Sequence, residues 1–559
     1  MNRYGYCKRW LSIIAWLLLL ALLSGCFVEG LNPSEGGSTM PSATQGSDKS
    51  GIRILSYPDA AVQKLSDPNF TLSEFTKRGA GETSYKGNGH YDGTSLVESP
   101  YFTASVNSLD VPVYATPVYV ATESHGALHS YASLDVDFSV HSMVTITLSV
   151  NLVKMQYAEV YSHDPAVLSY ADQTIRLTVT KNGAYTVVLN DSQNYAITIF
   201  VRTYEDEDAK IREYQDLYGA ENVIVYEPGL HEIDYILMLK SNTVLYLKAG
   251  AVLLPRHTMD IQSDQDAAAA NEFGAAQTNA IGLKCYPVIN GFNAQNLIIA
   301  GRGTVDMTQL DWHERRGIVF TLCKNVTMDG VIILNPSEWA FITYRCENVT
   351  VTQSAVMGYR TNSDAFAICN SIEVDVSNCF ARTGDDMFEV KTLGGVETAI
   401  SRDITFSRCQ AWGSKARCFG VIGEIEKDVS NILFEDGIVI FRDATWDNNR
   451  IGSLVVLREC GTGTVKNVTF RNITIHHDAG RAIQVGVYTD DLSKVRMEGI
   501  VFENITYTAQ KDSQIRANVG EGNVISVIFK NVKANGMLLT TDNVYQYTMW
   551  DQSGMVTVE

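Results

Sequence analysis

Two short acidic motifs carry the residues of this sequence that are best suited to chemistry. They read Asn362-Ser363-Asp364 and Gly384-Asp385-Asp386, so Asp364 and Asp385 lie 21 residues apart. This interval is close to one turn of a β-solenoid, in which equivalent positions of neighbouring turns stack about 4.8 Å apart. Three carboxylates in one patch repel one another, which raises the pKa of at least one of them. The result is an acid beside a base, the groups needed to cleave a glycosidic bond.

The elements that must position these motifs follow from a repeated strand unit. The steps from Val326 to Val349, from Val349 to Val374 and from Val374 to Ile404 are 23, 25 and 30 residues. A helical repeat would show apolar stripes with a period of about 3.6 residues, and none is present. We therefore predict an all-β chain in which residues 204–559 form a right-handed parallel β-helix. The units are centred on Val326, Val349, Val374, Ile404, Ile432, Val468, Ile500 and Val527.

Residues 51–203 show a different pattern, with short strands of alternating polarity. Residues 134–140 and 145–150 alternate between apolar and polar side chains, and turn residues bound them. Such alternation predicts an antiparallel β-sandwich that precedes the β-helix. The charged stretch 204–221 is expected to form a short connecting helix.

The first 26 residues are expected to be a targeting segment. Arg3, Lys8 and Arg9 precede an apolar run of 14 residues, too short for a comfortable membrane span. The run ends in Leu23-Ser24-Gly25-Cys26, which resembles the lipobox of bacterial lipoproteins. This resemblance implies cleavage before Cys26, lipidation of its thiol and anchoring outside the cytoplasmic membrane. Residues 27–50 are rich in Gly, Ser and Thr and are predicted to be a flexible tether. An ordinary secretion signal is the alternative.

The bulk properties exclude one class of partner. The net charge of −19 and the pI near 5.0 argue against nucleic acid, because phosphate binding needs basic patches. Eight cysteines, from Cys285 to Cys460, fall in the repetitive region, where we expect buried, stacked thiols rather than disulfides. No CxxC pair is present, which argues against a structural zinc site, and no cofactor or metal is predicted.

Residues 335–391 resemble glycoside hydrolase family 28, the polygalacturonases and their relatives. The similarity lies in Asn335-Pro336-Ser337-Glu338-Trp339 and in the two acidic motifs, the second of which is followed by Glu389-Val390-Lys391. A looser similarity spans about 300 residues from Gly301-Arg302-Gly303 onward. The amino-terminal region is similar to the extra domain of bacterial relatives and of the related family 49 dextranases. The resemblance implies that Asp385 is the general acid, that Asp364 and Asp386 activate water, and that cleavage inverts the anomeric configuration, with carboxyls about 6.5–9.5 Å apart.

The sequence departs from the polygalacturonase pattern at two motifs. Where those enzymes carry Gly-His-Gly, this chain reads Arg417-Cys418-Phe419-Gly420. Their Arg-Ile-Lys motif, which holds the galacturonate carboxylate, has no clean match around Arg458. The dextranase-type relatives keep the three aspartates without the histidine, so a neutral glucan such as dextran is as good a candidate substrate as a pectin-like polysaccharide.

Polar and aromatic residues around and after the aspartates are predicted to contact the sugar, because sugars need bidentate hydrogen bonds and an aromatic platform. Lys391 is the strongest single candidate. For each of the others, an ion pair on the solvated face, or a place in the core for Trp339, is the alternative. The predicted substrate-binding residues are Trp339, Asn362, Glu389, Lys391, Arg417, Glu424, Arg450 and Arg458.

Two further functions remain open at this stage. A polysaccharide lyase or epimerase on the same scaffold would need an Arg or Lys base against a uronate, usually with calcium. A surface-tethered glycan-binding protein without catalysis would fit the missing histidine motif. The sequence does not define the sugar, the linkage, endo or exo action, or the oligomeric state.

Overall fold

The structure is a computed structural model, and it describes residues 51–63, 93–120, 127–257, 277–278, 284–394, 399–413, 415–443, 451–488, 496–517, 524–550 and 554–559. The predicted signal segment, the tether, Cys26 and Arg450 lie outside these ranges. Within them, no helix has the length and apolar character required to cross a membrane.

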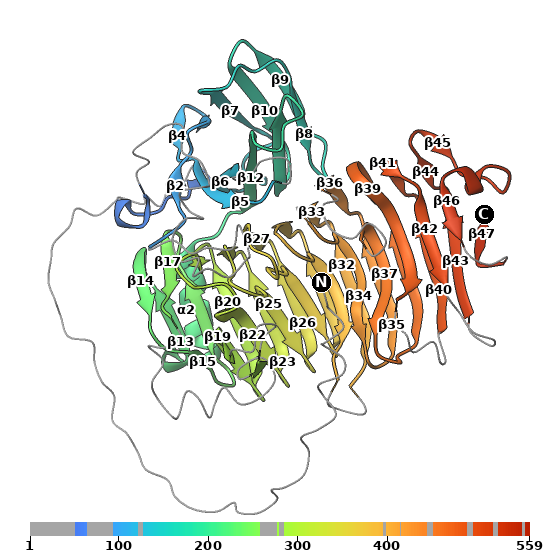
Figure 1. Ribbon diagram of the computed structural model, residues 1–559. Helices are drawn as coiled ribbons and strands as arrows, with labels where there is room; N and C mark the ends of the chain where they lie inside the picture. The colour runs from blue at the N-terminus through green and yellow to red at the C-terminus, as the bar shows by residue number, and fades with distance from the viewer. Residues whose placement is uncertain are drawn as a thin grey trace, which may run out of the picture. The chain divides into compact units, whose positions relative to one another are not determined.

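Two sheets of strands form the amino-terminal part (Figure 1), and burial alternates along strands of one of them. In β7, Val144, Ile146, Leu148 and Val150 are buried, and the residues between them are not. The first sheet contains β1 (Ile52–Ile54), β2 (Val97–Glu98), β5 (Tyr114–Val118), β6 (Ala127–Val136), β8 (Ala158–Tyr161), β11 (Gly183–Leu189) and β12 (Ala196–Thr203). The second contains β3 (Phe102–Val106), β4 (Leu109–Val111), β7 (Val144–Val150), β9 (Val167–Ala171) and β10 (Thr174–Val179). Their facing side chains share one core, which confirms the antiparallel sandwich, although β6 and β12 pair in parallel.

A short helix, α2 (Glu207–Tyr218), follows the sandwich. The carboxylate of Asp206 caps it by accepting a hydrogen bond from the backbone N–H of Ala209 at 3.0 Å. Asp206 therefore satisfies one of the N–H groups that a helix start leaves unpaired. The charged stretch accordingly forms the helix that was predicted for it.

The strands from Val223 onward stack coil upon coil into parallel ladders (Figure 1). The first ladder is one sheet: β13 (Val223–Tyr226), β16 (Val244–Leu247), β20 (Gln295–Gly301), β23 (Lys324–Asp329), β26 (Glu347–Thr352), β29 (Ile372–Ser377), β32 (Ser401–Ser407), β35 (Val429–Glu435), β38 (Val465–Arg471), β40 (Arg496–Glu503), β43 (Val524–Lys530) and β47 (Val556–Val558). Val326, Val349, Val374 and Ile404 pair in register along it. The predicted repeat and the parallel β-helix are therefore confirmed.

Two further ladders make up the other large sheet. The second ladder contains β14 (Gly229–Ile233), β17 (Ala251–Pro255), β21 (Thr304–Asp306), β24 (Ile332–Leu334), β27 (Ala355–Met357), β30 (Phe380–Arg382), β33 (Gln410–Gly413), β36 (Ile438–Arg442), the start of β39 (Thr474–Val487), β41 (Thr506–Lys511) and β44 (Lys533–Ala534). The third contains β15 (Leu237–Leu239), β19 (Lys284–Phe292), β22 (Arg315–Thr321), β25 (Phe341–Tyr344), β28 (Phe366–Cys369), β31 (Phe388–Thr392), β34 (Phe419–Ile425), β37 (Gly452–Cys460), the end of β39, β42 (Ser513–Ala517) and β46 (Thr548–Trp550).

Asparagines shape the corner at which the first ladder begins. Asn325 and Asn348 adopt φ values of 55° and 57°, a left-handed conformation that asparagine tolerates. The Asn348 amide donates to Asn325, and the Asn325 amide donates to Asn296, each at 2.9 Å. The corner residues of these successive coils are thus bonded to one another, which supports their register.

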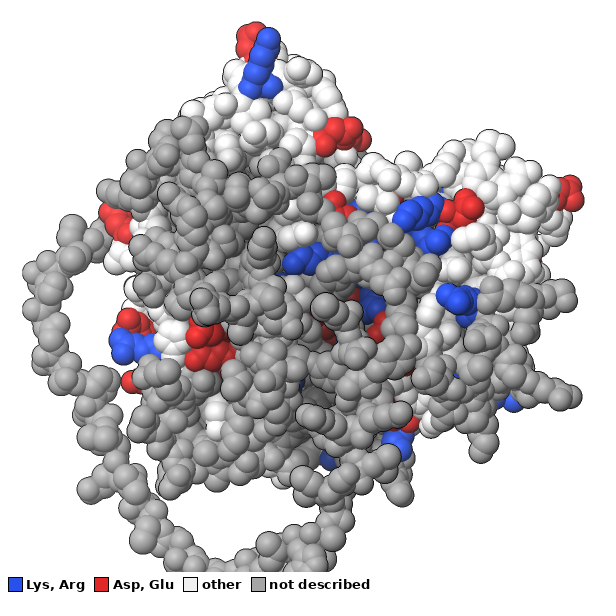
Figure 2. Space-filling view, in the orientation of Figure 1, with Lys and Arg blue, Asp and Glu red and all other residues white. Residues whose placement is uncertain are grey.

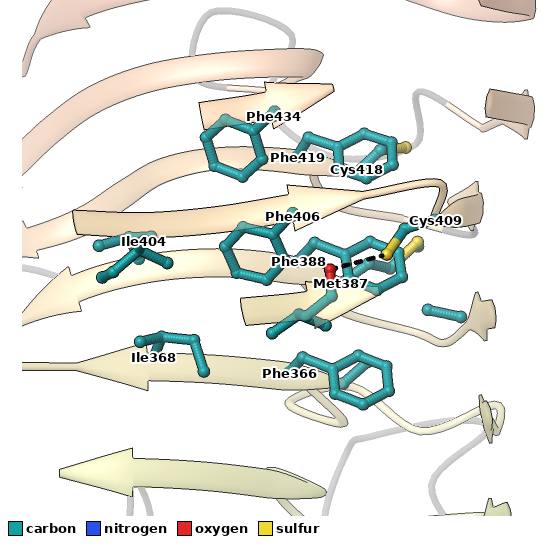
Figure 3. Packing of buried hydrophobic residues seen from close by; sticks show 14 of the residues in the cluster. Phe366, Ile368, Met387, Phe388, Ile404, Phe406, Cys409, Cys418, Phe419 and Phe434 are labelled. Carbon is teal, nitrogen blue, oxygen red and sulfur yellow. Dashed lines mark hydrogen bonds between the residues drawn. The ribbon is translucent and has the colours of Figure 1, made fainter. Parts of the chain in front are cut away.

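Aromatic rings fill the interior beneath the third ladder (Figure 3). The rings of Phe366 and Phe388 stack with centroids 5.3 Å apart, and those of Phe388 and Phe419 at 5.0 Å. Each phenylalanine lies two residues after Asp364, Asp386 or Arg417. These three residues therefore lie in the turns that lead into β28, β31 and β34. The eight described cysteines are free thiols, and all but Cys460 are buried, as predicted.

Candidate functional site

Asp364, Asp386 and Arg417 occupy successive rungs of the third ladder. Phe366 pairs with Phe388, and Phe388 pairs with Phe419, so the residues two positions earlier also stack. The backbone N–H of Ala365 donates to the carbonyl of Asp386 at 2.9 Å, and that of Met387 donates to the carbonyl of Arg417 at 3.1 Å. The register partner of Asp364 is therefore Asp386, not Asp385 as the 21-residue interval suggested, and Asp385 lies one residue earlier, in the turn.

Hydrogen bonds join the turn that carries Asp364 to the turn that carries Asp385. The hydroxyl of Ser363 donates to the carbonyl of Arg360 at 2.6 Å and accepts from the backbone N–H of Gly384 at 3.0 Å. A Cβ atom on Gly384 would lie only 2.1 Å from the Arg360 carbonyl oxygen. The glycine of the Gly-Asp-Asp motif is thus required because the two turns approach too closely for any side chain.

Arg360, which the sequence reasoning missed, supports the same turn from inside. It is fully buried, and its guanidinium donates to the backbone carbonyls of Thr308 and Leu310 at 2.7 and 2.8 Å, and to those of Met307 and Asn335 at 3.2 and 2.9 Å. Nothing in the sequence marks this arginine as buried, because its partners are backbone groups of earlier coils. It is a positioning residue for the Asp364 turn.

The three aspartates converge as predicted. An oxygen of each of Asp364, Asp385 and Asp386 lies within 4.8 Å of an oxygen of the other two, and all three side chains are buried. These oxygens are closer than the carboxyl spacing of about 6.5–9.5 Å that is typical of an inverting pair. A single water can still contact two oxygens at this separation, because two hydrogen bonds of about 2.8 Å reach across it. The Oδ1 atom of Asp364 is buried and has no hydrogen-bond partner among the described residues.

Lys391 is the cation on the Asp364 side of the cluster. Its Nζ lies 3.1 Å from Glu389, 3.2 Å from Glu424 and 3.7 Å from Asp364. Burial, together with the charges of Asp385 and Glu389, raises the pKa of Asp364 well above its usual range. Burial also raises the pKa of Glu389 to about 8, against the opposing effect of Lys391. Both carboxyls therefore retain a proton more readily than an ordinary aspartate or glutamate.

Arg417 is the cation on the Asp386 side. Its backbone N–H donates to Oδ1 of Asp386 at 3.0 Å, and its Nη1 donates to Oδ2 at 2.9 Å. Its Nη2 forms an ion pair with Glu459. Charge-assisted bonds to both oxygens stabilise the ionised carboxylate and fix its orientation.

Asp385, the predicted general acid, is held by backbone groups. It accepts hydrogen bonds from the N–H of Asn362 at 2.9 Å and from that of Asp386 at 3.0 Å. Asn362, a predicted substrate contact, adopts a φ of 61°, which turns its N–H toward Asp385. Backbone N–H donors favour the charged form of a carboxylate, so this geometry does not by itself mark Asp385 as the acid.

Trp339 lies one rung before Asp364, because the N–H of Ala340 donates to the Asp364 carbonyl at 2.7 Å. Its indole is half-buried, with the Lys391 ammonium 4.7 Å and the Arg316 guanidinium carbon 5.4 Å from the ring centroid. Arg316 is itself paired with Glu338 at 3.3 Å. Trp339 therefore touches the acidic cluster through Lys391, and the structure brings it together with the aspartates.

The remaining predicted contacts divide into two groups. Glu424 on β34 is half-buried and joins the cluster through Lys391. Arg458 is buried on β37, where it pairs in register with Gly423. Its charge acts on Glu426, which follows β34 and is not a member of the aspartate cluster.

Lys415 is a site residue that the sequence reasoning did not identify. Its Nζ donates to the Thr361 hydroxyl at 3.1 Å and lies 3.9 Å from the ring centroid of Tyr119, a residue of the sandwich region. Burial lowers its pKa to about 8, and the charge of Asp385 opposes that shift. The signal available in the sequence was its place two residues before Arg417, on the same approach to a strand.

Two groups of side chains have the spacing of metal ligands in the described part of the chain. The three aspartates form one, and His257, Asp311 and Glu314 form the other. In the aspartate group, the ammonium of Lys391 and the guanidinium of Arg417 already supply positive charge. In the second group, His257 Nδ1 lies 2.8 Å from Glu314. We therefore assign neither group as a metal site.

Charged groups elsewhere on the molecule follow the same paired arrangement. Where Figure 2 shows described residues, blue basic and red acidic side chains lie beside one another in several places. The buried pairs Arg302–Asp135 and Arg442–Asp478 are examples inside the structure.

Comparisons with known proteins agree with this geometry. The sequence pattern of the family described as glycosyl hydrolases family 28 matches residues 246–549, more than half of the chain. A polygalacturonase of Persea americana is 22% identical over 215 residues, covering 36% of this chain and 42% of that protein. A probable endopolygalacturonase D of Neosartorya fischeri is 25% identical over 183 residues, covering 31% and 36%. The chain thus spans less than half the length of these curated relatives.

The fold is also found among solved structures. Dex49A from Penicillium minioluteum superposes with a TM-score of 0.61 over 92% of this chain and 99% of that chain, at 12% sequence identity. At this identity the similarity concerns the fold alone. It covers the amino-terminal sandwich as well as the β-helix, because so little of either chain is left unmatched.

Proposed function

This chain belongs to family 28 of the glycosyl hydrolases, and from that premise we propose that it hydrolyses glycosidic bonds of an extracellular polysaccharide with inversion of the anomeric configuration. The observation that carries the proposal is the convergence of Asp364, Asp385 and Asp386 from two adjacent coils. Burial and mutual repulsion give such a cluster a protonated and an ionised member at the same pH, which is what acid-assisted hydrolysis requires.

The roles within the cluster follow from its two cations. Asp386, bonded through both oxygens to Arg417, is the member that orients and deprotonates the attacking water. The acid is Asp385 according to the family resemblance, whereas burial and neighbouring charge raise the pKa of Asp364. Asp364 and Asp385 share a proton that the cluster takes up. The carboxyl that lies nearer to the glycosidic oxygen of the bound substrate donates this proton.

The pairing of charges favours a neutral sugar at the cleavage point. Lys391 is surrounded by three carboxylates, and Arg417 is held between Asp386 and Glu459. A uronate carboxylate would have to displace one of these partners. Lys415 favours the second candidate, a pectin-like uronate chain, because it has no carboxylate within salt-bridge distance among the described residues.

The cellular setting is part of the proposal. Lipidation at Cys26 would anchor the enzyme outside the cytoplasmic membrane, where residues 27–50 would hold it away from the lipid surface. Incorporation of labelled fatty acid that is lost in a Cys26→Ala variant would support this, whereas unchanged incorporation would exclude Cys26 as the attachment point.

A comparison of aspartate variants tests the chemistry. The wild-type protein should release reducing ends from a panel of dextran, pullulan and pectic polysaccharides, and Asp386→Asn should lose about 10²–10⁴-fold of that rate. Aryl glycosides with good leaving groups need no acid, so the acid variant alone should regain activity on them. Regain by Asp385→Asn assigns the acid to Asp385, and regain by Asp364→Asn assigns it to Asp364. Full activity of Asp386→Asn on polysaccharide would refute the proposal.

A further inference from the structure

Arg417 stands where the polygalacturonase pattern has a histidine, and its contacts give it a definite place in the site. It is 5% exposed, and both its backbone N–H and its guanidinium bond to the same carboxylate, one to each oxygen of Asp386. Its Nη2 pairs with Glu459, which is carried on β37, the next strand of the ladder. The guanidinium is thus held between two carboxylates on neighbouring coils.

The charges around Asp386 make Arg417 its countercharge. The Lys391 ammonium lies 3.1–3.7 Å from carboxylate oxygens of Glu389, Glu424 and Asp364, so these three groups share its charge. The titratable and charged groups that face Asp386 are Asp364 before β28, Asp385 beside it, Glu389 and Lys391 on β31, and Arg417 and Cys418 before β34. Only Arg417 both carries positive charge and donates directly to Asp386 within this set.

We propose that Arg417, oriented by Glu459, is a positioning residue that pairs with Asp386 and keeps its carboxylate aimed at the attacking water. This inference rests on the proposed function and replaces the substrate contact predicted for Arg417 from the sequence. The planar guanidinium and the backbone N–H occupy one lone pair of each Asp386 oxygen, which leaves the others for water. Nη1 of Arg417 bonds to Asp386 and Nη2 pairs with Glu459. We therefore expect Arg417 to act on the orientation of Asp386 and not on the affinity for the sugar.

The variants Arg417→Gln and Arg417→Lys separate these roles. Without the cation, the Asp386 carboxylate loses its charged partner, and the loss of a nearby opposite charge disfavours the charged form of a carboxylate. The acid limb of the kcat/KM profile should move upward by about 1–3 pH units in Arg417→Gln. KM should stay within about twofold, because the substrate contact is unchanged. Arg417→Lys should restore most of the shift, because it keeps the charge, but with a lower kcat, because it lacks the fork.

Arg302→Gln is the matched control, since Arg302 is a similarly buried arginine, 3% exposed, paired with Asp135 of the sandwich. It should lower the melting temperature without moving the acid limb. Glu459→Gln should give a smaller shift of the limb than Arg417→Gln, in the same direction. An unmoved acid limb in Arg417→Gln, or a KM increase as its main effect, would overturn the inference.

A measurement that needs no turnover separates this inference from the proposed function. In a stability cycle at pH 7, Arg417→Gln should lower the melting temperature much more in the wild-type background than in Asp386→Asn, because only the former leaves a buried carboxylate unpaired. Equal effects in the two backgrounds would refute the pairing. If the wild-type protein cleaves no glycan, the proposed function fails and this cycle still decides the role of Arg417.

Discussion

Glu389 offers a quantitative test of the electrostatics at this site. It is fully buried on β31, and its register partners are Ala367 and Gly420, which provide no polar side chain. The cation that faces it is the Lys391 ammonium, 3.1 Å from Oε2. Burial is the main reason that its pKa is raised to about 8.

The substitution Glu389→Gln replaces the protonated carboxyl with a neutral amide of the same shape. The pKa rises from 4.5 to about 8, which is about 3.5 pH units. At about 1.4 kcal/mol per unit, this corresponds to about 5 kcal/mol of folding free energy. Because the folded-state value is the higher one, the stabilisation is fully present below about pH 4.5 and is lost as the pH rises through about 8.

Denaturation of the wild type and of Glu389→Gln by guanidinium chloride between pH 4.5 and pH 9 measures this contribution of Glu389 to the free energy of folding. We expect similar midpoints at the acid end and an increasing advantage of the variant toward the alkaline end, with up to about 5 kcal/mol between the limits. Parallel pH dependences of variant and wild type would show that Glu389 is ionised in the folded protein, and would refute the reasoning.

Three further substitutions test the packing and the site. Phe388→Ala should cost about 3–5 kcal/mol in denaturation, because the ring is buried between Phe366 and Phe419, and a loss below about 1 kcal/mol would contradict this. Gly384→Ala should abolish most hydrolysis by displacing Asp385. Gly394→Ala is the control and should stay active, because its Cβ would have no neighbour closer than 3.8 Å. Equal activity of the two variants would refute the close approach of the two turns at Gly384. Lys391→Met should shift the rate profile toward alkaline pH, because three carboxylates lose their shared cation, and an unchanged profile would exclude that role.

The repeat of the β-helix could be predicted from the sequence because most coils repeat the same local requirement. An asparagine that tolerates a positive φ precedes a buried valine or isoleucine, so residues such as Asn348 and Val349 mark the same corner in successive coils. The aspartate motifs were found for the same reason, since short turns keep them one coil apart. The register between Asp364 and Asp386 could not be predicted, because one residue in the turn before β31 decides it.

The environment of the site was less accessible to sequence reasoning. Arg360 bonds to backbone carbonyls of coils some 50 residues earlier, and Lys415 contacts Tyr119 from the sandwich region. Such partners depend on three-dimensional stacking and leave no mark on local spacing. The sequence identified Arg417 but not its role. Only the geometry shows that its Nη1 pairs with Asp386 and its Nη2 with Glu459.

The anomeric configuration of the first product tests the central claim most directly. Proton NMR during hydrolysis of a polysaccharide that the enzyme cleaves resolves the anomer released before mutarotation. If water attacks from Asp386 while an acid of the same cluster protonates the leaving oxygen, the new reducing end should have the configuration opposite to that of the cleaved bond. Release of the same configuration would require a covalent sugar–carboxylate intermediate and would contradict this account of the three aspartates.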